Sequence, residues 1–102
     1  MEHQDEEIQE MQILDQNLHN ILLQKQAFDM ELSETKSALG EIEKSGEIFK
    51  LIGELMIKSD KEKVREELSN KEKLLNMRIK SIEKQEDALT KRLDDLRTKF
   101  SK

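Results

Sequence analysis

The stretch GEIFKLIGELMIKSD, residues 46–60, differs from the sequence around it and decides how the chain folds. Seven of the ten residues from Ile48 to Ile57 are large and apolar, whereas charged residues make up 40% of the whole chain and apolar residues 34%. The chain has 102 residues and no proline, and its three glycines all lie between positions 40 and 53. A compact domain of this length usually has a larger apolar share. The composition therefore favours long, charged helices that are interrupted near the centre.

On both sides of this stretch, apolar residues recur with the spacing of a coiled coil. A heptad frame that starts at Met11 has apolar residues at eight of its ten a and d positions, and the exceptions are Lys25 and Thr35. Those ten positions are Met11, Leu14, Leu18, Ile21, Lys25, Phe28, Leu32, Thr35, Leu39 and Ile42. The second frame has Leu68, Leu75, Ile82, Leu89 and Leu96 at d, and Arg65, Glu72, Ile79, Glu86, Leu93 and Phe100 at a. Both patterns predict long coiled-coil helices.

The two frames are out of phase, because counting sevens from Met11 makes Leu68 a b residue rather than a d residue. Ser59 and Glu62 have the spacing of a capping box, which marks a helix start. Gly46 suits the left-handed residue that follows a helix end. The expected organisation is one unit over 1–102, with a helix at 1–45, a β-hairpin at 46–59 and a helix at 60–102.

Charge indicates how the two helices are arranged. Residues 1–46 carry 11 acidic and 3 basic side chains, a net charge of −8, whereas residues 47–102 carry 12 acidic and 15 basic side chains, a net charge of +3. Individual surface pairs are weak and are screened by salt. Their common sign nevertheless favours an acidic helix beside a more basic one. We therefore predict that the chain folds back into an antiparallel coiled coil rather than forming a parallel homodimer.

The central stretch predicts two short strands, near 47–51 and 54–58, with Gly53 in the turn. A strict period of two places Phe49, Leu51, Leu55 and Ile57 on one face. A helical segment is the alternative, since short apolar runs also match helical spacing.

An isolated hairpin of this kind is at best marginally stable in water, and each strand has an unpaired edge. Fully burying a large apolar side chain contributes about 1.5–3 kcal/mol before ordering costs. We therefore predict that the hairpin pairs with the same segment of other subunits. The predicted assembly residues are Ile48, Phe49, Leu51, Ile52, Gly53, Leu55, Met56 and Ile57. The predicted fold class is mainly α, an antiparallel coiled-coil helical hairpin with a small β-hairpin that pairs between subunits.

Three segments in order, ELSETKSALGEIE (31–43), IFKLIGELMIK (48–58) and EELSNKEKLLNMRIKSIEKQEDALTKRLDDL (66–96), resemble the β-type subunit of prefoldin. The most specific match is an aromatic-Lys-x-x-Gly-x-Leu-x-x-Lys stretch formed by Phe49, Lys50, Gly53, Leu55 and Lys58. The Glu-Lys-Gln-Glu of 83–86 adds to it. The connector after Glu43 departs from the family in being short and lacking a proline.

The resemblance implies a hexamer of two α-type and four β-type subunits, whose hairpins form a platform of two β-barrels and whose coiled coils project from it. It also implies an ATP-independent holdase that captures unfolded polypeptides at the tips of its arms and delivers them to a group II chaperonin. The implied partners are an α-type subunit, other β-type copies, unfolded polypeptides and that chaperonin.

The residues predicted to bind clients are the apolar ones far from the hairpin. They are Ile8, Met11, Ile13, Leu14, Leu93, Leu96 and Phe100. Ile8 and Ile13 occupy e and c positions, so a two-helix seam cannot fully cover them. Leu14, Leu93 and Leu96 instead match seam positions, where packing within the coiled coil is the simpler interpretation.

Other functions have little support in the sequence. Without a GxxxxGK[S/T] phosphate loop or any cysteine, and with His3 and His19 16 residues apart, we expect no enzyme, cofactor or metal site. The net charge of −5 argues against nucleic acid, and no apolar run is long enough to span a bilayer. The acidic start lacks a secretory signal, so a cytoplasmic location is expected. The alternatives are a tethering coiled coil that binds one folded partner, and a four-helix homodimer with a helical middle.

Overall fold

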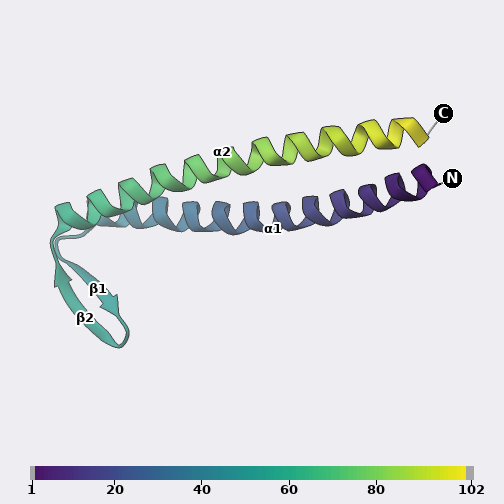
Figure 1. Cartoon of the computed structure of the whole chain (residues 1–102). Helices are drawn as coiled ribbons and strands as arrows, with labels where there is room; N and C mark the ends of the chain where they lie inside the picture. The colour runs from purple at the N-terminus through teal and green to yellow at the C-terminus, as the bar shows by residue number, and fades with distance from the viewer. Residues whose placement is uncertain (1, 101–102) are drawn as a thin grey trace. The chain divides into compact units, whose positions relative to one another are not determined.

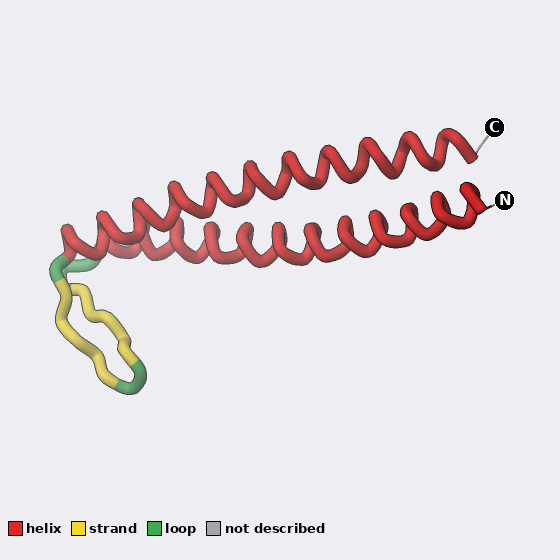
Figure 2. Tube along the Cα trace, in the orientation of Figure 1, coloured by secondary structure: helices red, strands yellow, loops and turns green. Residues whose placement is uncertain are grey.

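The computed structural model describes residues 2–100 and consists of two long helices with a β-hairpin between them in the sequence (Figures 1 and 2). The elements are α1 (Glu2–Lys44), β1 (Ile48–Ile52), β2 (Leu55–Ser59) and α2 (Lys61–Phe100). The predicted order of helix, hairpin and helix is confirmed. Each strand begins one residue later than expected. The helical alternative for the middle, and with it the four-helix homodimer, is wrong, because residues 48–59 form a paired antiparallel sheet.

The chain divides into two compact units, each of which is described by itself. The terminal unit comprises Met1–Ala27 and Ile79–Lys102, and the hairpin unit comprises Phe28–Arg78. Within each unit, a segment of α1 runs antiparallel to a segment of α2 (Figure 1). The predicted fold-back of the chain is therefore confirmed.

The heptad positions form the contact between the helices in each unit. Every a and d residue of the first frame is buried or half-buried, and in the second frame Phe100 is the one exposed member. Leu75 at a d position is 2% exposed, whereas its neighbour Leu74 is 46% exposed. Apolar residues outside the frames, such as Leu23, Met30 and Met77, are also exposed. This alternation confirms both predicted frames.

Polar residues within the seam have specific partners. In the terminal unit, Lys25 Nζ lies 3.5 Å from Glu86 Oε1, so the polar exception of one frame meets a polar a residue of the other. In the hairpin unit, Thr35 is buried and its hydroxyl donates to the Glu31 carbonyl oxygen at 2.8 Å. Buried polar groups require such partners. A single polar pair in an apolar seam also favours one alignment of the helices over others.

The ion pairs between helices follow the charge difference of the two halves. In the hairpin unit, Glu31 on α1 pairs with Lys71 on α2 at 3.1 Å. Glu43 on α1 likewise pairs with Arg65 on α2 at 2.7 Å. In both, the carboxylate lies on the acidic helix and the cation on the more basic one, which agrees with the predicted antiparallel arrangement.

The start of α2 differs from the prediction. Asp60, not Ser59, caps the helix, because Asp60 Oδ1 accepts a hydrogen bond from the Glu62 backbone N–H at 3.0 Å. Ser59 is the last residue of β2, and its hydroxyl donates to the Ile57 carbonyl at 3.2 Å. A side chain committed to the strand cannot reach the free amides of the next helix, so the capping-box interpretation of Ser59 and Glu62 is wrong.

The end of α1 also differs from the prediction. Gly46 is not in the left-handed region, since Gly53 is the one residue with positive φ among the described residues. Ser45 follows the helix instead, and its backbone N–H donates to the Ile42 carbonyl at 3.2 Å. Its hydroxyl donates to the Glu41 carbonyl at 2.9 Å. These two bonds satisfy carbonyl groups that a helix end leaves without partners.

Leu75 and Leu74 offer a matched test of the seam. We expect Leu75→Ala to lower the free energy of unfolding by about 2–5 kcal/mol, because it removes buried apolar contacts and leaves a cavity. Leu74→Ala should change it by less than about 0.5 kcal/mol, since surface substitutions have small effects. Urea unfolding followed by far-UV circular dichroism measures both. Equal effects of the two substitutions would contradict the assigned frame.

Candidate functional site

The central hairpin is the first candidate site, and its turn is built on glycine. Gly53 and Glu54 connect Ile52 to Leu55, which are directly opposite each other in the sheet. Gly53 has φ of +62°, whereas no other described residue has a positive φ. A two-residue turn with a positive φ at its first position is of type II′, for which glycine is the usual residue. Gly53 thus has a conformational role in the hairpin rather than a contact role.

The register assigns each side chain to a face. One face has the pairs Phe49–Lys58 and Leu51–Met56; the other has Ile48–Ser59, Lys50–Ile57 and Ile52–Leu55. The predicted common face of Phe49, Leu51, Leu55 and Ile57 is wrong. Directly opposite residues of antiparallel strands share a face, and here their numbers differ by an odd number. The period of two therefore does not continue from one strand through the turn into the next.

Both faces of the hairpin carry large exposed apolar side chains. Phe49, Leu51 and Met56 on one face are 48–71% exposed, and Ile52, Leu55 and Ile57 on the other are 45–67% exposed. The sheet has two strands, so the outer edge of each has no strand partner within the described chain. A sheet that is apolar on both faces is typical of one that is covered on both sides. The hairpin therefore has the surface of a sheet that is completed by other strands.

One ion pair joins the hairpin to a helix of its unit, and a second joins β2 to the residue before β1. Lys50 Nζ on β1 lies 2.8 Å from Glu67 Oε2 on α2. Lys58 Nζ on β2 lies 3.6 Å from Glu47 Oε1, just before β1. All four side chains are at least 43% exposed, so each pair contributes little to stability. They orient the hairpin rather than cover it.

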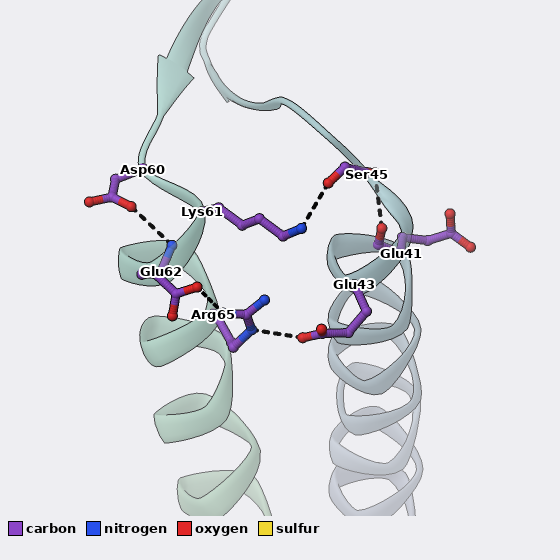
Figure 3. A network of polar contacts seen from close by, with 7 residues as sticks. All are labelled: Glu41, Glu43, Ser45, Asp60, Lys61, Glu62 and Arg65. Atoms are coloured by element: carbon purple, nitrogen blue, oxygen red, sulfur yellow. Dashed lines mark hydrogen bonds and ion pairs between the residues drawn. The ribbon is translucent and has the colours of Figure 1, made fainter.

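A network of polar contacts ties together the points where the chain leaves α1 and enters α2 (Figure 3). Lys61 Nζ donates to the Ser45 carbonyl at 2.9 Å. Arg65 donates to Glu43 at 2.7 Å and also to Glu62. These bonds to Glu62 and Glu43 raise the pKa of Arg65 above its ordinary value. The heptad could have indicated that Arg65 pairs with a carboxylate, because a cation at an a position needs a partner. No pattern in the sequence indicated the contact of Lys61.

The helix ends form the second candidate site, and the structure divides the seven residues predicted there. Leu14, Leu93 and Leu96 form a buried cluster, with Met11, Leu18 and Leu89 packed against it. Ile8, Ile13 and Phe100 are 42%, 60% and 37% exposed. Leu14, Leu93 and Leu96 are covered by the opposite helix. The apolar side chains available to another molecule are therefore those of Ile8, Ile13 and Phe100.

Residues close in sequence to these three form ion pairs between the helices of the terminal unit. Arg92 donates two hydrogen bonds to Glu10, at 2.8 and 3.1 Å. Lys99 Nζ lies 2.6 Å from Glu7, and Arg97 lies 3.3 Å from Asp15. The hydrogen bonds from Arg92 hold the pKa of Glu10 below its ordinary value, and Glu10 raises that of Arg92. The ends of the two helices are thus held together by charge as well as by the apolar seam.

The described residues form no cluster of metal ligands, no pocket and no membrane-spanning helix. In the described part of the chain, no group of three or more His, Asp or Glu side chains is placed to hold a metal ion. No pocket is found there either. None of the helices within residues 2–100 has a stretch apolar and long enough to cross a membrane.

Comparison with known proteins gives a consistent family. Residues 5–102 match the family described as prefoldin subunit. Prefoldin subunit beta of Thermococcus onnurineus is 42% identical over 88 residues, covering 83% of this chain and 76% of that protein. The same subunit of Saccharolobus islandicus is 35% identical over 98 residues, covering 93% and 78%. The crystal structure of the prefoldin beta subunit from Thermococcus strain KS-1 is similar with a TM-score of 0.87 and 31% identity, covering 95% of this chain and 88% of that one.

The Glu10–Arg92 contact predicts a specific pH dependence. Because the folded pKa of Glu10 is depressed, its stabilising effect is present above the ordinary pKa of the carboxyl group. That effect is lost as the pH falls through the folded pKa. NMR titration should therefore find that Arg92→Gln raises the pKa of Glu10, whereas Lys91→Gln leaves it nearly unchanged. A Glu10 pKa that does not respond to Arg92→Gln would exclude the contact.

Proposed function

The chain belongs to the prefoldin subunit family, a family of chaperone subunits, and from that premise we propose that it is the β-type subunit of an ATP-independent holdase. In this proposal its hairpin joins α-type and further β-type subunits into a hexamer. The ends of its helices capture unfolded polypeptides, which the assembly delivers to a group II chaperonin.

The observation that carries the proposal is the hairpin, which is apolar on both faces and open at both edges. In a single chain, that surface stays in contact with water. Strands from neighbouring subunits would supply hydrogen-bond partners at the edges and cover the faces. The predicted assembly residues from Ile48 to Ile57 keep that role in the proposal, with Gly53 shaping the turn.

Client binding is assigned to the exposed apolar residues at the helix ends, Ile8, Ile13 and Phe100. A small apolar surface binds any one client segment weakly. Several such surfaces on one assembly raise the overall affinity, because each binding event increases the effective concentration of the next. Binding to unfolded rather than folded chains lowers the concentration of free aggregation-prone species by mass action. Holding a client in this way requires no nucleotide.

Met11, Leu14, Leu93 and Leu96 support this site indirectly. They lie in or against the buried cluster of the terminal unit, and so they keep the two helix ends together. We propose that they contact clients only where the helix pair opens. Delivery to a group II chaperonin is the step of the proposal that rests on the family alone.

Acidic substitutions in the hairpin test the assembly step. We expect Phe49→Asp or Leu55→Glu to lower the mass measured by light scattering towards the 12.0 kDa of one chain. The reason is that a carboxylate would have to be buried without a partner. Far-UV circular dichroism should show that the helices are retained. Asn70→Glu, which adds a carboxylate to an exposed position of α2, should leave the mass unchanged. Full assembly of both hairpin variants would refute the role of the hairpin.

Paired substitutions test the client-binding step. We expect Ile8→Gln with Ile13→Gln to weaken the suppression of aggregation of a denatured protein in the absence of ATP, because less apolar surface is offered to the client. Leu74→Gln with Met77→Gln removes a similar amount of exposed apolar surface from the hairpin unit and should have little effect. Light scattering during refolding, with an α-type subunit present, measures both. Equal suppression of aggregation by the two pairs of variants would exclude the helix ends as the client-binding site. Binding to one folded protein, without any suppression of aggregation, would favour a tethering function.

A further inference from the structure

The outward face of α1 in the terminal unit is uncharged between Gln12 and Ala27. This surface, here called the neutral band, comprises every residue at the b, c, f and g positions of that stretch. Its members are the apolar residues Ile13, Leu23 and Ala27, together with His19 and six amides. The amides are Gln12, Gln16, Asn17, Asn20, Gln24 and Gln26. All ten side chains are exposed, which is unusual in a chain of which 40% is charged.

Charge in this part of α1 is directed to α2 instead. The stretch holds two charged residues, Asp15 and Lys25. Asp15 is bonded to Arg97 and Lys25 to Glu86, both on α2. The outward face of α2 in the same unit has the opposite character. Its exposed charged residues at the same heptad positions are Lys80, Lys84, Asp87, Lys91, Arg92, Asp94, Asp95 and Lys99. One side of the helix pair is therefore neutral and the other is highly charged.

The chemistry of the neutral band suits an unfolded polypeptide. Asn and Gln side chains carry both donors and acceptors, so they can bond to either polar group of a peptide unit. An unfolded segment exposes those groups, whereas a folded protein has already paired them. Ile13 and Leu23, which are 60% and 51% exposed, add apolar contacts. Segments that aggregate are typically apolar and low in charge. When such a segment binds to a face without charges, no charged side chain of that face loses its contact with water.

We propose that the neutral band binds uncharged segments of unfolded polypeptides and so extends the client-binding surface inward from the helix ends. This inference rests on the holdase function proposed above. Ile13, which is 60% exposed, belongs to both sets of residues. At about 1.5 Å per residue, the 16 residues of the band span about 24 Å. That length matches about seven residues of an extended chain at about 3.3 Å each.

The size of the band argues against a second folded copy as its occupant. A helix with its side chains is about 10 Å wide, so the band covers on the order of 240 Å². A stable pair of folded proteins buries roughly 800 Å² on each partner. A flexible segment can use a small surface, because further segments of the same client bind elsewhere on the assembly.

Two matched pairs of substitutions test the neutral band. Asn20→Glu with Ala27→Glu adds two carboxylates at c positions of α1, within the band. Ser81→Glu with Ala88→Glu adds two at c positions of α2, with the same spacing and in the same unit. All four positions are exposed and neutral. The probe is a fluorescein-labelled, unstructured peptide of Ser, Gln, Val and Leu without charged residues, and its Kd for the full chain assembled with its α-type partner is measured by fluorescence anisotropy.

We expect the α1 pair to raise this Kd by about fivefold or more, because bound peptide would desolvate the new carboxylates. The α2 pair should change it by less than about twofold, since its carboxylates join a surface that is already charged. Equal effects of the two pairs would overturn the inference, as would the absence of any effect. A lower mass of the α1 pair alone would also overturn it, by showing that the band joins copies of the chain. Failure of the unmodified assembly to bind the peptide would overturn the inference as well, whereas loss of the suppression of aggregation by the unmodified assembly would reject the holdase function itself.

Discussion

A two-stranded sheet that is apolar on both faces cannot cover itself, and the other features of this protein are arranged around that constraint. The hairpin between Ile48 and Ser59 exposes large apolar residues on each face and an open edge on each strand. An ion pair between Lys50 of β1 and Glu67 of α2 joins it to a helix of its own unit and leaves these apolar residues exposed. The surface is therefore free for strands of other subunits. The chain belongs to a family of subunits, and assembly through the hairpin is the proposal that this surface supports.

Within each unit, the segments of α1 and α2 are held together mainly by the residues of their seam. Apolar residues bury one stripe on each helix, and outside the neutral band many of the exposed residues are charged. The half-buried pair Lys25–Glu86 and the buried, hydrogen-bonded Thr35 interrupt the apolar seam without leaving buried polar groups unpaired in the described part of the chain. A structure held by a narrow seam leaves most of its surface available for contact. That is consistent with client binding by Ile8 and Ile13 without a dedicated pocket.

The departures from the sequence-based predictions have local physical causes. Ser59 was expected to cap α2, but strand pairing extends to Ser59, and the cap falls to Asp60. The faces of the hairpin were assigned by counting in twos through the turn, which fails when a two-residue turn reverses the chain. The seven residues expected at the helix ends differ in exposure, because Leu14, Leu93 and Leu96 pack between the helices while Ile8 and Ile13 do not.

Periodicity and charge were sufficient to determine the two helices and their antiparallel arrangement. Each depends on residues close in sequence or on the total charge of a segment. The sequence favoured strands between the helices, but only the structure excluded a helical middle. The tertiary structure alone decided which residues meet across elements, such as Lys25 with Glu86, Lys61 with the Ser45 carbonyl, and Phe49 with Lys58. Those contacts depend on how far one element is shifted along another. A heptad or a period of two repeats along the chain, so it fits several shifts equally well, and only packing in three dimensions selects one.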